Sequence, residues 1–250
     1  MTSKLPCGAA MTHLDQSTVE NTLLKMLSAD RFARLSEGME RVDLPIRHVL
    51  VASDVPTTHV CFLERGLASM VVSSIDEEVV EIGHIGREGA SGMHVVLAVE
   101  TTPTRTFMQV AGSGIMVPME TFQRALADDL EMKAFFLRYV HTTVLQLAHS
   151  ALANARYNMH ERLARWILMC HDRLEGNDLA ITHEFLALML GVRRSGVTNE
   201  LHVLEGVHAI RSTRGNVRIM DREKLIEIAG GCYGVPEREY EKLLGPLRAR

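Results

Sequence analysis

The sequence lacks the long apolar run of a membrane-spanning helix. Its uninterrupted hydrophobic stretches fall far short of the roughly 20 residues that cross a bilayer, although hydrophobic residues make up 46% of the 250 positions. The stretch from Met1 to Met11 has one lysine and no apolar core, so no secretory signal is expected there. We therefore expect a folded cytoplasmic protein, long enough for two modest domains.

Clustered cysteines and catalytic motifs are also missing. The chain has four widely spaced cysteines and no C-x-x-C pair: Cys7, Cys61, Cys170 and Cys232. This spacing argues against a disulfide framework and against an iron–sulfur cluster, which needs clustered thiolates. His141 and His149, or Cys170 and His171, are more simply explained as hydrogen-bonded groups than as ligands, so no metal or cofactor is expected. Nucleophile-elbow, Walker, H-E-x-x-H and dinucleotide motifs do not occur, which argues against an enzyme.

What the sequence does contain is a pair of short helical patterns between residues 179 and 205. Their apolar stripes have helical spacing, first Leu186, Met189 and Leu190, then Val197, Leu201 and Leu204. Thr182 precedes the first stripe and suits an N-cap. Gly191 lies between the stripes and allows the tight backbone of a short turn. The pattern predicts a helix-turn-helix.

The second of these helices has a polar face that suits DNA. Its members are Arg193, Arg194, Ser195, Thr198, Asn199 and His202. Arginine pairs bidentately with guanine and asparagine with adenine, while hydroxyl groups suit phosphates or bases. We expect Arg194, Ser195 and Asn199 to reach base edges, with Thr198 on the same face. The alternative is the solvated face of an ordinary helical hairpin.

A predicted β-hairpin follows the second helix. Two β-like runs, 209–211 and 217–220, flank a Gly/Asn turn at 212–216. Such a hairpin is a wing, and Arg214 at its tip can reach a phosphate; Arg193, His202 and Thr182 are the other phosphate candidates. Residues 191–222 hold six arginines against three acidic residues, whereas the whole chain has a net charge of −4. This local excess of positive charge favours a phosphate-facing surface.

Residues 179–225 resemble the winged helix of the cyclic-AMP receptor protein/FNR family of bacterial transcription regulators. The matching positions are Ile181-Thr182, Gly191, Arg194, Val197, Leu201, Leu204-Glu205, the wing, and the helix start at 221–225. The family's recognition helix usually reads Arg-Glu-x-x-x-Arg, whereas this chain has Arg194-Ser195-x-x-x-Asn199. The resemblance implies the same mode of binding and does not fix the preferred DNA sequence.

The region between residues 40 and 119 is rich in short β-like runs separated by Gly, Pro, Asp and Ser. The runs resemble, in pattern and order, the double-stranded β-helix of the same family, a jelly roll like a cyclic-nucleotide-binding domain. Residues 62–67 lie where that domain has a strand–Gly–strand turn. We therefore expect an α+β fold with a loose arm at 1–16 and an effector domain at 17–129, which begins with short helices between residues 21 and 39.

Helical patterns dominate after Pro118. Residues 130–156 form a long predicted helix whose apolar stripe is Met132, Phe135, Phe136, Tyr139, Val140, Val144, Leu147 and Ala151. This stripe predicts a two-helix dimer seam, with Thr143, Gln146 and His149 available to fix the register; the alternative is packing only on its own domain. A DNA-binding domain at 157–230 follows, and the tail at 231–250 is expected either to cap that domain or to be solvated.

A Gly-rich run in the N-terminal domain is the candidate effector site. It comprises Gly86, Arg87, Glu88, Gly89 and Gly92, with Thr104 and Arg105 as the counterpart of the family's phosphate-binding element. Met93 stands where the family's cyclic-nucleotide binders have glutamate, and the arginine is displaced by one place. The favoured interpretation is that the glycines only shape the barrel.

These patterns together predict a homodimeric transcription regulator that reads a palindromic site on double-stranded DNA through the major groove. An unidentified small molecule is its candidate effector, and RNA polymerase is a candidate partner. The alternative is a sensor of cyclic nucleotides or other small molecules whose helix-turn-helix contacts protein. DNA binding would weaken steeply with salt, which distinguishes the two.

Overall fold

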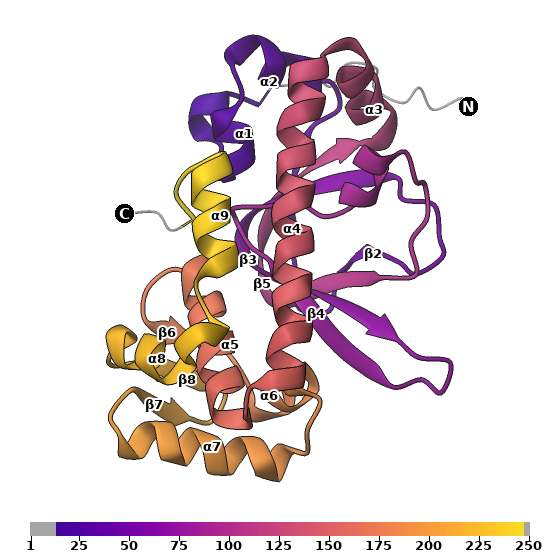
Figure 1. Cartoon of the computed structure of the whole chain (residues 1–250). Coiled ribbons are helices and arrows are strands. Elements are labelled where there is room, and N and C mark those ends of the chain that lie inside the picture. The colour runs from indigo at the N-terminus through magenta and orange to yellow at the C-terminus, as the bar shows by residue number, and fades with distance from the viewer. Residues whose placement is uncertain (1–13, 248–250) are drawn as a thin grey trace, which may run out of the picture.

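The computed structural model describes residues 14–247, and α4 (Leu130–Arg156) runs along most of the length of the molecule (Figure 1). A β-rich unit lies on one side of α4, and a mostly helical unit lies at its C-terminal end. We call the elements before α4 the barrel unit and those from α5 (Met159–Arg173) to η3 (Gly230–Cys232) the winged-helix unit. None of the helices in this part of the chain is long and apolar enough to cross a membrane.

The barrel unit is built on a five-stranded antiparallel sheet with the order β1-β5-β3-β4, in which β2 also pairs with β5. Its strands are β1 (Glu40–Leu44), β2 (Val49–Val51), β3 (His59–Ser73), β4 (Val79–Ile85) and β5 (Arg105–Pro118). Its helices are η1 (Gln16–Thr18), α1 (Thr22–Met26), α2 (Ala29–Leu35), η2 (Met93–Leu97) and α3 (Met119–Asp128). The α+β prediction is confirmed.

Strand β3 corrects one expectation. Residues 62–67 do not form a turn between two strands, because β3 continues through them as an inner strand of the sheet. Gly66 adopts φ +85°, and a Cβ there would lie 2.6 Å from the carbonyl oxygen of Val110. The pairing with β5 shifts register on both sides of this residue. The glycine therefore bends one long strand and lets β5 approach closely.

Helix α4 begins at a strong cap and has two different faces. The carboxylate of Asp129 accepts the Met132 N–H at 2.9 Å, which satisfies a free donor of the first turn. Met132, Phe136 and Tyr139 are buried in the core of their own barrel unit. These side chains therefore cannot form a seam with a second copy, and the predicted dimer stripe is wrong at these positions. The side-chain amide of Gln146 is likewise used inside the chain, where it binds both backbone groups of His84.

The winged-helix unit has a core of its own. After α5 come β6 (Asp178–Leu179), α6 (His183–Leu190), α7 (Arg194–Gly206), β7 (Ile210–Thr213), β8 (Asn216–Ile219) and α8 (Arg222–Ala229). The apolar faces of α5, α6 and α7 form one buried cluster with β7, β8 and α8. Leu67 of β3 belongs to the same cluster, so the two units share an apolar interface. Asn158 and Glu161 form a capping box at the start of α5.

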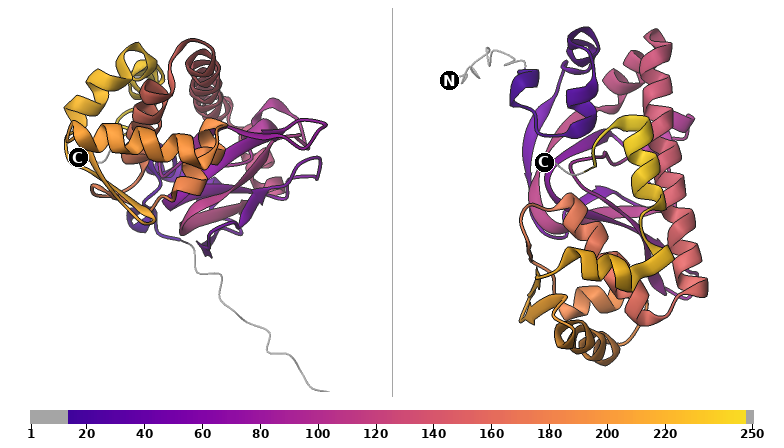
Figure 2. Two further views of the ribbon diagram at one scale, coloured as in Figure 1. Left: turned by 90° about the horizontal axis from the view of Figure 1, so that it is seen from below. Right: turned by 60° about the vertical axis from the view of Figure 1, so that its left-hand side comes forward.

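The C-terminal tail does not follow either expectation. Helix α9 (Val235–Leu244) leaves the winged-helix unit and lies beside α4 (Figure 1; Figure 2, right). Tyr240, Leu244 and Leu247 are buried in the core of the barrel unit. From α9 onward the tail therefore neither caps the winged-helix unit nor lies in solvent, because its apolar side chains complete the barrel unit.

Candidate nucleic-acid interface and barrel cavity

The helix pair α6–α7 is set by the local features that predict it. The Thr182 hydroxyl accepts the Phe185 N–H at 3.1 Å and so caps α6. Gly191 ends α6 in the left-handed region with φ +63°, where glycine has no steric penalty. Val197, Leu201 and Leu204 then point into the core. As a result, the opposite face of α7 is presented to solvent.

That opposite face carries most of the predicted DNA-contacting side chains. The exposed members are Arg193, Arg194, Ser195, Asn199 and His202. Arg193 is the N-cap residue of α7, and Arg194 and Ser195 lie in its first turn. The free N–H groups and positive dipole of a helix N-terminus add to the attraction for phosphate. The structure thus leaves the two arginines and the asparagine accessible to solvent, with both arginines at the positive N-terminal end of α7.

Thr198 is oriented by a residue that the sequence did not reveal. The ring of His183 lies between two hydroxyl groups, with Nδ1 3.2 Å from Thr198 Oγ1 and Nε2 3.1 Å from Ser212 Oγ. His183 thereby joins α6, α7 and the wing. Burial, followed by repulsion from Arg194 and His202, lowers the pKa of His183. Nothing in the local pattern around His183 identifies this role, because its partners lie 15 and 29 residues away.

The wing is a tighter hairpin than expected. Strands β7 and β8 include Ser212, Thr213 and Asn216, so the turn is reduced to Arg214 and Gly215. Gly215 has φ +78°, as a two-residue hairpin turn requires. Arg214 is exposed at the tip. The predicted five-residue turn is therefore too long, although its basic residue lies where the hairpin points outward.

A groove of about 790 Å³ separates α7 from the wing. It is lined by Thr182, His183, Glu184, Arg194, Thr198, Leu201, His202, Glu205, Ser212, Thr213, Arg214 and Gly215. The Glu205 carboxylate accepts the Ser212 N–H at 2.6 Å and contacts His202 Nδ1 at 3.2 Å. This acidic group is thus used to fasten the wing to α7, and the exposed charged groups of the groove are Arg194, Arg214 and Glu184.

A second hollow lies between the barrel sheet and α4. This cavity of about 180 Å³ is lined by Val51, Met70, Ile82, Ile85, Ala90, Gly92, Met93, His94, Leu97, Thr102, Thr104, Thr106, Tyr139, Val140, Thr143, Val144 and Leu147. No Lys, Arg, Asp or Glu is among these residues. Burial lowers the pKa of His94, whose Nε2 lies 3.0 Å from the Thr57 hydroxyl. The cavity is therefore apolar, with hydroxyl groups as its polar contacts.

The structure separates the predicted effector residues. Gly92 and Thr104 line the cavity. Arg87 instead pairs with Glu175 at 3.3 Å, and the exposed Arg105 stacks on Phe107 with 5.3 Å between its Cζ and the ring centroid. Neither arginine is placed to bind a phosphate in the cavity.

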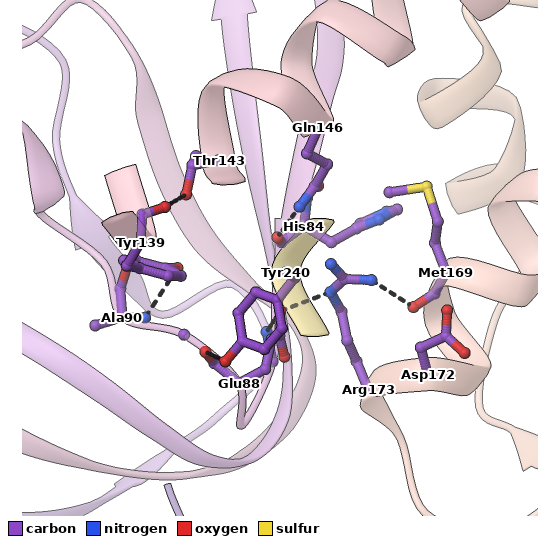
Figure 3. A network of polar contacts seen from close by, with 12 residues as sticks. His84, Glu88, Ala90, Tyr139, Thr143, Gln146, Met169, Asp172, Arg173 and Tyr240 are labelled. Atoms are coloured by element: carbon purple, nitrogen blue, oxygen red, sulfur yellow. Dashed lines mark hydrogen bonds and ion pairs between the residues drawn. The ribbon is translucent and has the colours of Figure 1, made fainter. Parts of the chain in front are cut away.

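The remaining predicted residues serve packing between elements. A Cβ on Gly86 would lie 2.6 Å from the Cβ of Arg173, and one on Gly89 would collide with the Tyr139 hydroxyl. Glu88 turns away from the cavity and its Oε1 accepts the Nε–H of Arg173 at 2.8 Å (Figure 3). The loop from Gly86 to Gly92 thus allows close approach of α4 and α5 to the sheet, which agrees with the favoured structural interpretation.

Comparison with known proteins agrees with this architecture. Residues 161–228 match the family model of the Crp-like helix-turn-helix domain. The structure of FixK2 from Bradyrhizobium japonicum is similar with a TM-score of 0.68 at 14% identity, covering 77% of this chain and 98% of that chain. A putative transcriptional regulator of the Crp/Fnr family from Eubacterium rectale gives a TM-score of 0.65 at 14% identity, covering 83% and 97%.

A third similar structure is that of the c-di-GMP responsive global regulator CLP from Xanthomonas campestris, with a TM-score of 0.63 at 15% identity, covering 77% of this chain and 99% of that chain. No curated protein sequence matches the chain. The family resemblance expected from the sequence is confirmed by the domain match and by the fold. The chain has the fold of the Crp/Fnr transcription regulators and carries a Crp-like helix-turn-helix domain at residues 161–228.

Proposed function

We propose that the protein is a dimeric transcription regulator that reads DNA with α7. In this proposal Arg194, Ser195 and Asn199 contact base edges in the major groove. The phosphate contacts come from Arg193, His202, Thr182 and Arg214, which fix the position of the helix. The observation that carries the proposal is the exposed polar face of α7, positive at its N-terminus and flanked by the basic tip of the wing.

The hydroxyl groups of Thr182 and Thr198 differ in how available they are to DNA. Thr182 is exposed, and its hydroxyl accepts the Phe185 N–H while its own hydrogen stays available for a phosphate. Thr198 is half-buried, and its hydroxyl contacts both the Arg194 carbonyl oxygen and His183. We assign Thr198 the task of keeping α7 in register with α6 and the wing, more than direct recognition of a base.

The outer face of α4 supports dimer formation. This face repeats with heptad spacing and consists of Leu130, Ala134, Leu137, His141, Val144, Ala148, Ala151 and Ala155, all of them exposed in the single chain. Leu130 and Val144 have exposed fractions of 77% and 54%. A second copy of α4 would cover these apolar groups, and the small alanines would let two helices approach closely. A two-fold dimer would present two α7 helices to a palindromic site.

The cavity between the sheet and α4 supports an uncharged, largely apolar effector. A cyclic nucleotide carries a phosphate that needs a cation or a set of free N–H groups, and no Arg or Lys lines this cavity. The hydroxyl groups of Thr102, Thr104 and Thr143 can bind one or two polar atoms of a ligand. RNA polymerase stays a candidate partner for the regulator once it is bound at a promoter.

Selection of bound duplexes from a random DNA pool tests the reading function directly. The purified, ligand-free protein should recover a palindrome with half-sites about one helical turn apart. Arg194→Ala should then weaken binding to that site by about 1–3 kcal/mol and relax one base position. Arg34→Ala, an exposed arginine in α2, is the matched control and should bind like the wild type. Unchanged selectivity of Arg194→Ala would contradict the assignment.

The alternative function, a sensor whose helix-turn-helix contacts protein, gives the opposite outcome. A DNA reader should lose affinity steeply as salt rises, because phosphate contacts release counterions. A protein-contact module should show no duplex binding even at low salt. Titration of a fluorescent duplex at several salt concentrations therefore separates the two functions.

The effector class is tested with a neutral fluorophore such as 1-aminoanthracene. Its emission should rise in the presence of the wild type and should not rise with Val140→Trp, which fills the cavity from α4. Cyclic AMP should not displace the fluorophore. Displacement by cyclic AMP, or equal emission with both proteins, would show that the ligand class is wrong.

A further inference from the structure

The C-terminal segment connects the winged-helix unit to the barrel unit for a second time. The first covalent connection is the junction of α4 and α5 at Tyr157 and Asn158. The second begins after η3, where the chain passes through Tyr233 and Gly234 into α9. A unit held at one junction can rotate about it, whereas a unit held at two separate points cannot do so freely.

The first anchor of this segment lies within the winged-helix unit. The Tyr233 hydroxyl donates to Asp172 Oδ2 at 2.6 Å and accepts from Arg222 Nη2 at 2.8 Å. Arg222 Nη2 also donates to Asp172 Oδ1 at 2.7 Å. Burial and the neighbouring Asp172 carboxylate raise the pKa of Tyr233 well above its ordinary value. Tyr233 is thereby fixed to α5 and α8.

The second anchor lies within the barrel unit. The Tyr240 hydroxyl donates to the backbone carbonyl of Glu88 at 2.6 Å, and only 5% of Tyr240 is exposed (Figure 3). Leu244 and Leu247, which follow on the same segment, are buried in the barrel core with exposed fractions of 5% and 4%. Removal of such apolar side chains from water stabilises the contact between α9 and the barrel unit. Helix α9 is therefore held by packing and by a hydrogen bond.

There is little slack between the two anchors. Six residues separate Tyr233 from Tyr240, and the Gly234 N–H is already bound to the Glu237 carboxylate at 3.0 Å at the start of α9. The C-terminal end of α5 faces both anchors, since Asp172 binds Tyr233 and the next residue, Arg173, binds the Glu88 side chain.

We propose that residues 233–247 form an intramolecular strap that fixes the orientation of the winged-helix unit on the barrel unit. Any rotation of the winged-helix unit about Tyr157 and Asn158 must pull Tyr240 away from the loop at 86–92 or break the hydrogen bonds of Tyr233 with Asp172 and Arg222. The same loop continues to Ala90, whose N–H is bound by the Tyr139 hydroxyl at 3.0 Å, and both Ala90 and Tyr139 line the cavity. The strap therefore ends on the loop that a cavity ligand would touch.

The test lengthens the strap without removing it. An insertion of about ten Gly and Ser residues between Tyr233 and Gly234 keeps both anchors but adds a connection with a root-mean-square span of about 17 Å. Spin labels at Thr101→Cys in the barrel unit and Glu227→Cys in the winged-helix unit, both exposed positions, report the distance between the units by pulsed electron resonance. Cys7→Ser removes a thiol outside the described residues, and Cys61, Cys170 and Cys232 are buried. Dilution with unlabelled protein keeps each spin pair within one protomer.

The wild type should give a narrow distance distribution, and the strap insertion should broaden it markedly. The matched control has the same insertion between Asp76 and Glu77, in the exposed β3–β4 turn, and should give the wild-type distribution. Thermal unfolding of all three proteins verifies that they are folded. A strap insertion whose distribution superimposes on that of the wild type would overturn the proposal, because the apolar interface alone would then hold the units. The measurement contains no DNA, so its outcome is independent of the proposed reading function.

Discussion

Replacement of Arg173 by methionine should strongly weaken the junction between the two units. Arg173 and Glu88 form an ion pair at 2.8 Å whose side chains are each only 4% exposed. Burial by itself lowers the pKa of the Arg173 guanidinium, but Glu88 and Asp172 outweigh that effect and raise it above its ordinary value. Without the arginine, the Glu88 carboxylate would keep a single hydrogen bond, from the Gly86 N–H at 3.2 Å.

The expected loss of stability in Arg173→Met follows from the burial of this ion pair. Removal of one partner of a buried ion pair costs about 3–5 kcal/mol, because the remaining charge stays buried without compensation. That is a large fraction of the 5–15 kcal/mol by which a domain is typically stable, to order of magnitude.

Urea unfolding followed by tryptophan fluorescence is the assay. Trp166 is the single tryptophan of the chain, and its indole N–H donates to Glu81 of β4 at 3.2 Å from the other side of the junction. Arg124→Met is the matched control, since Arg124 and Glu37 form a surface pair with exposed side-chain fractions of 57% and 65%. The control should lose no more than about 1 kcal/mol.

A double variant provides the decisive comparison. Adding Glu88→Gln to Arg173→Met removes the unpaired charge, so the double variant should be more stable than Arg173→Met alone. The reasoning is refuted if Arg173→Met costs no more than the Arg124→Met control. It is also refuted if the double variant is less stable than the single one, because the buried charge would then not be the cause.

Two further predictions concern the interface helices. The lowered pKa of His183 means that its neutral form is favoured in the folded state, so the protein should lose stability as the pH falls below about 6.5, the pKa of histidine in an unfolded chain. His183→Gln should remove this loss when thermal unfolding is measured at a series of pH values. An unchanged pH profile of the variant would contradict the prediction. Ala148→Glu should place like charges across the proposed α4 seam and yield monomers in sedimentation, whereas Ala33→Glu on α2 should not.

The sequence by itself determined the helix-turn-helix, because each of its features is local. The apolar stripes of α6 and α7 have helical spacing, Thr182 caps the helix that it precedes, and Gly191 takes the left-handed backbone expected of it. The basic wing tip at Arg214 also follows from neighbouring residues alone. Local spacing and capping depend on residues within one or two turns, so they can be read without knowledge of the fold.

Only the tertiary structure decided which elements pack against each buried face. Met132 and Phe136 looked like seam residues but are buried in the barrel unit, and the exposed seam of α4 lies on its other face. The joining of three elements by His183, and the contact of Tyr240 with Glu88 across 152 residues of sequence, have no local signal. An amphipathic helix shows in its sequence that it will bury one face, but the surface that covers this face is chosen by long-range packing. For that reason the C-terminal strap could not be found before the fold was known.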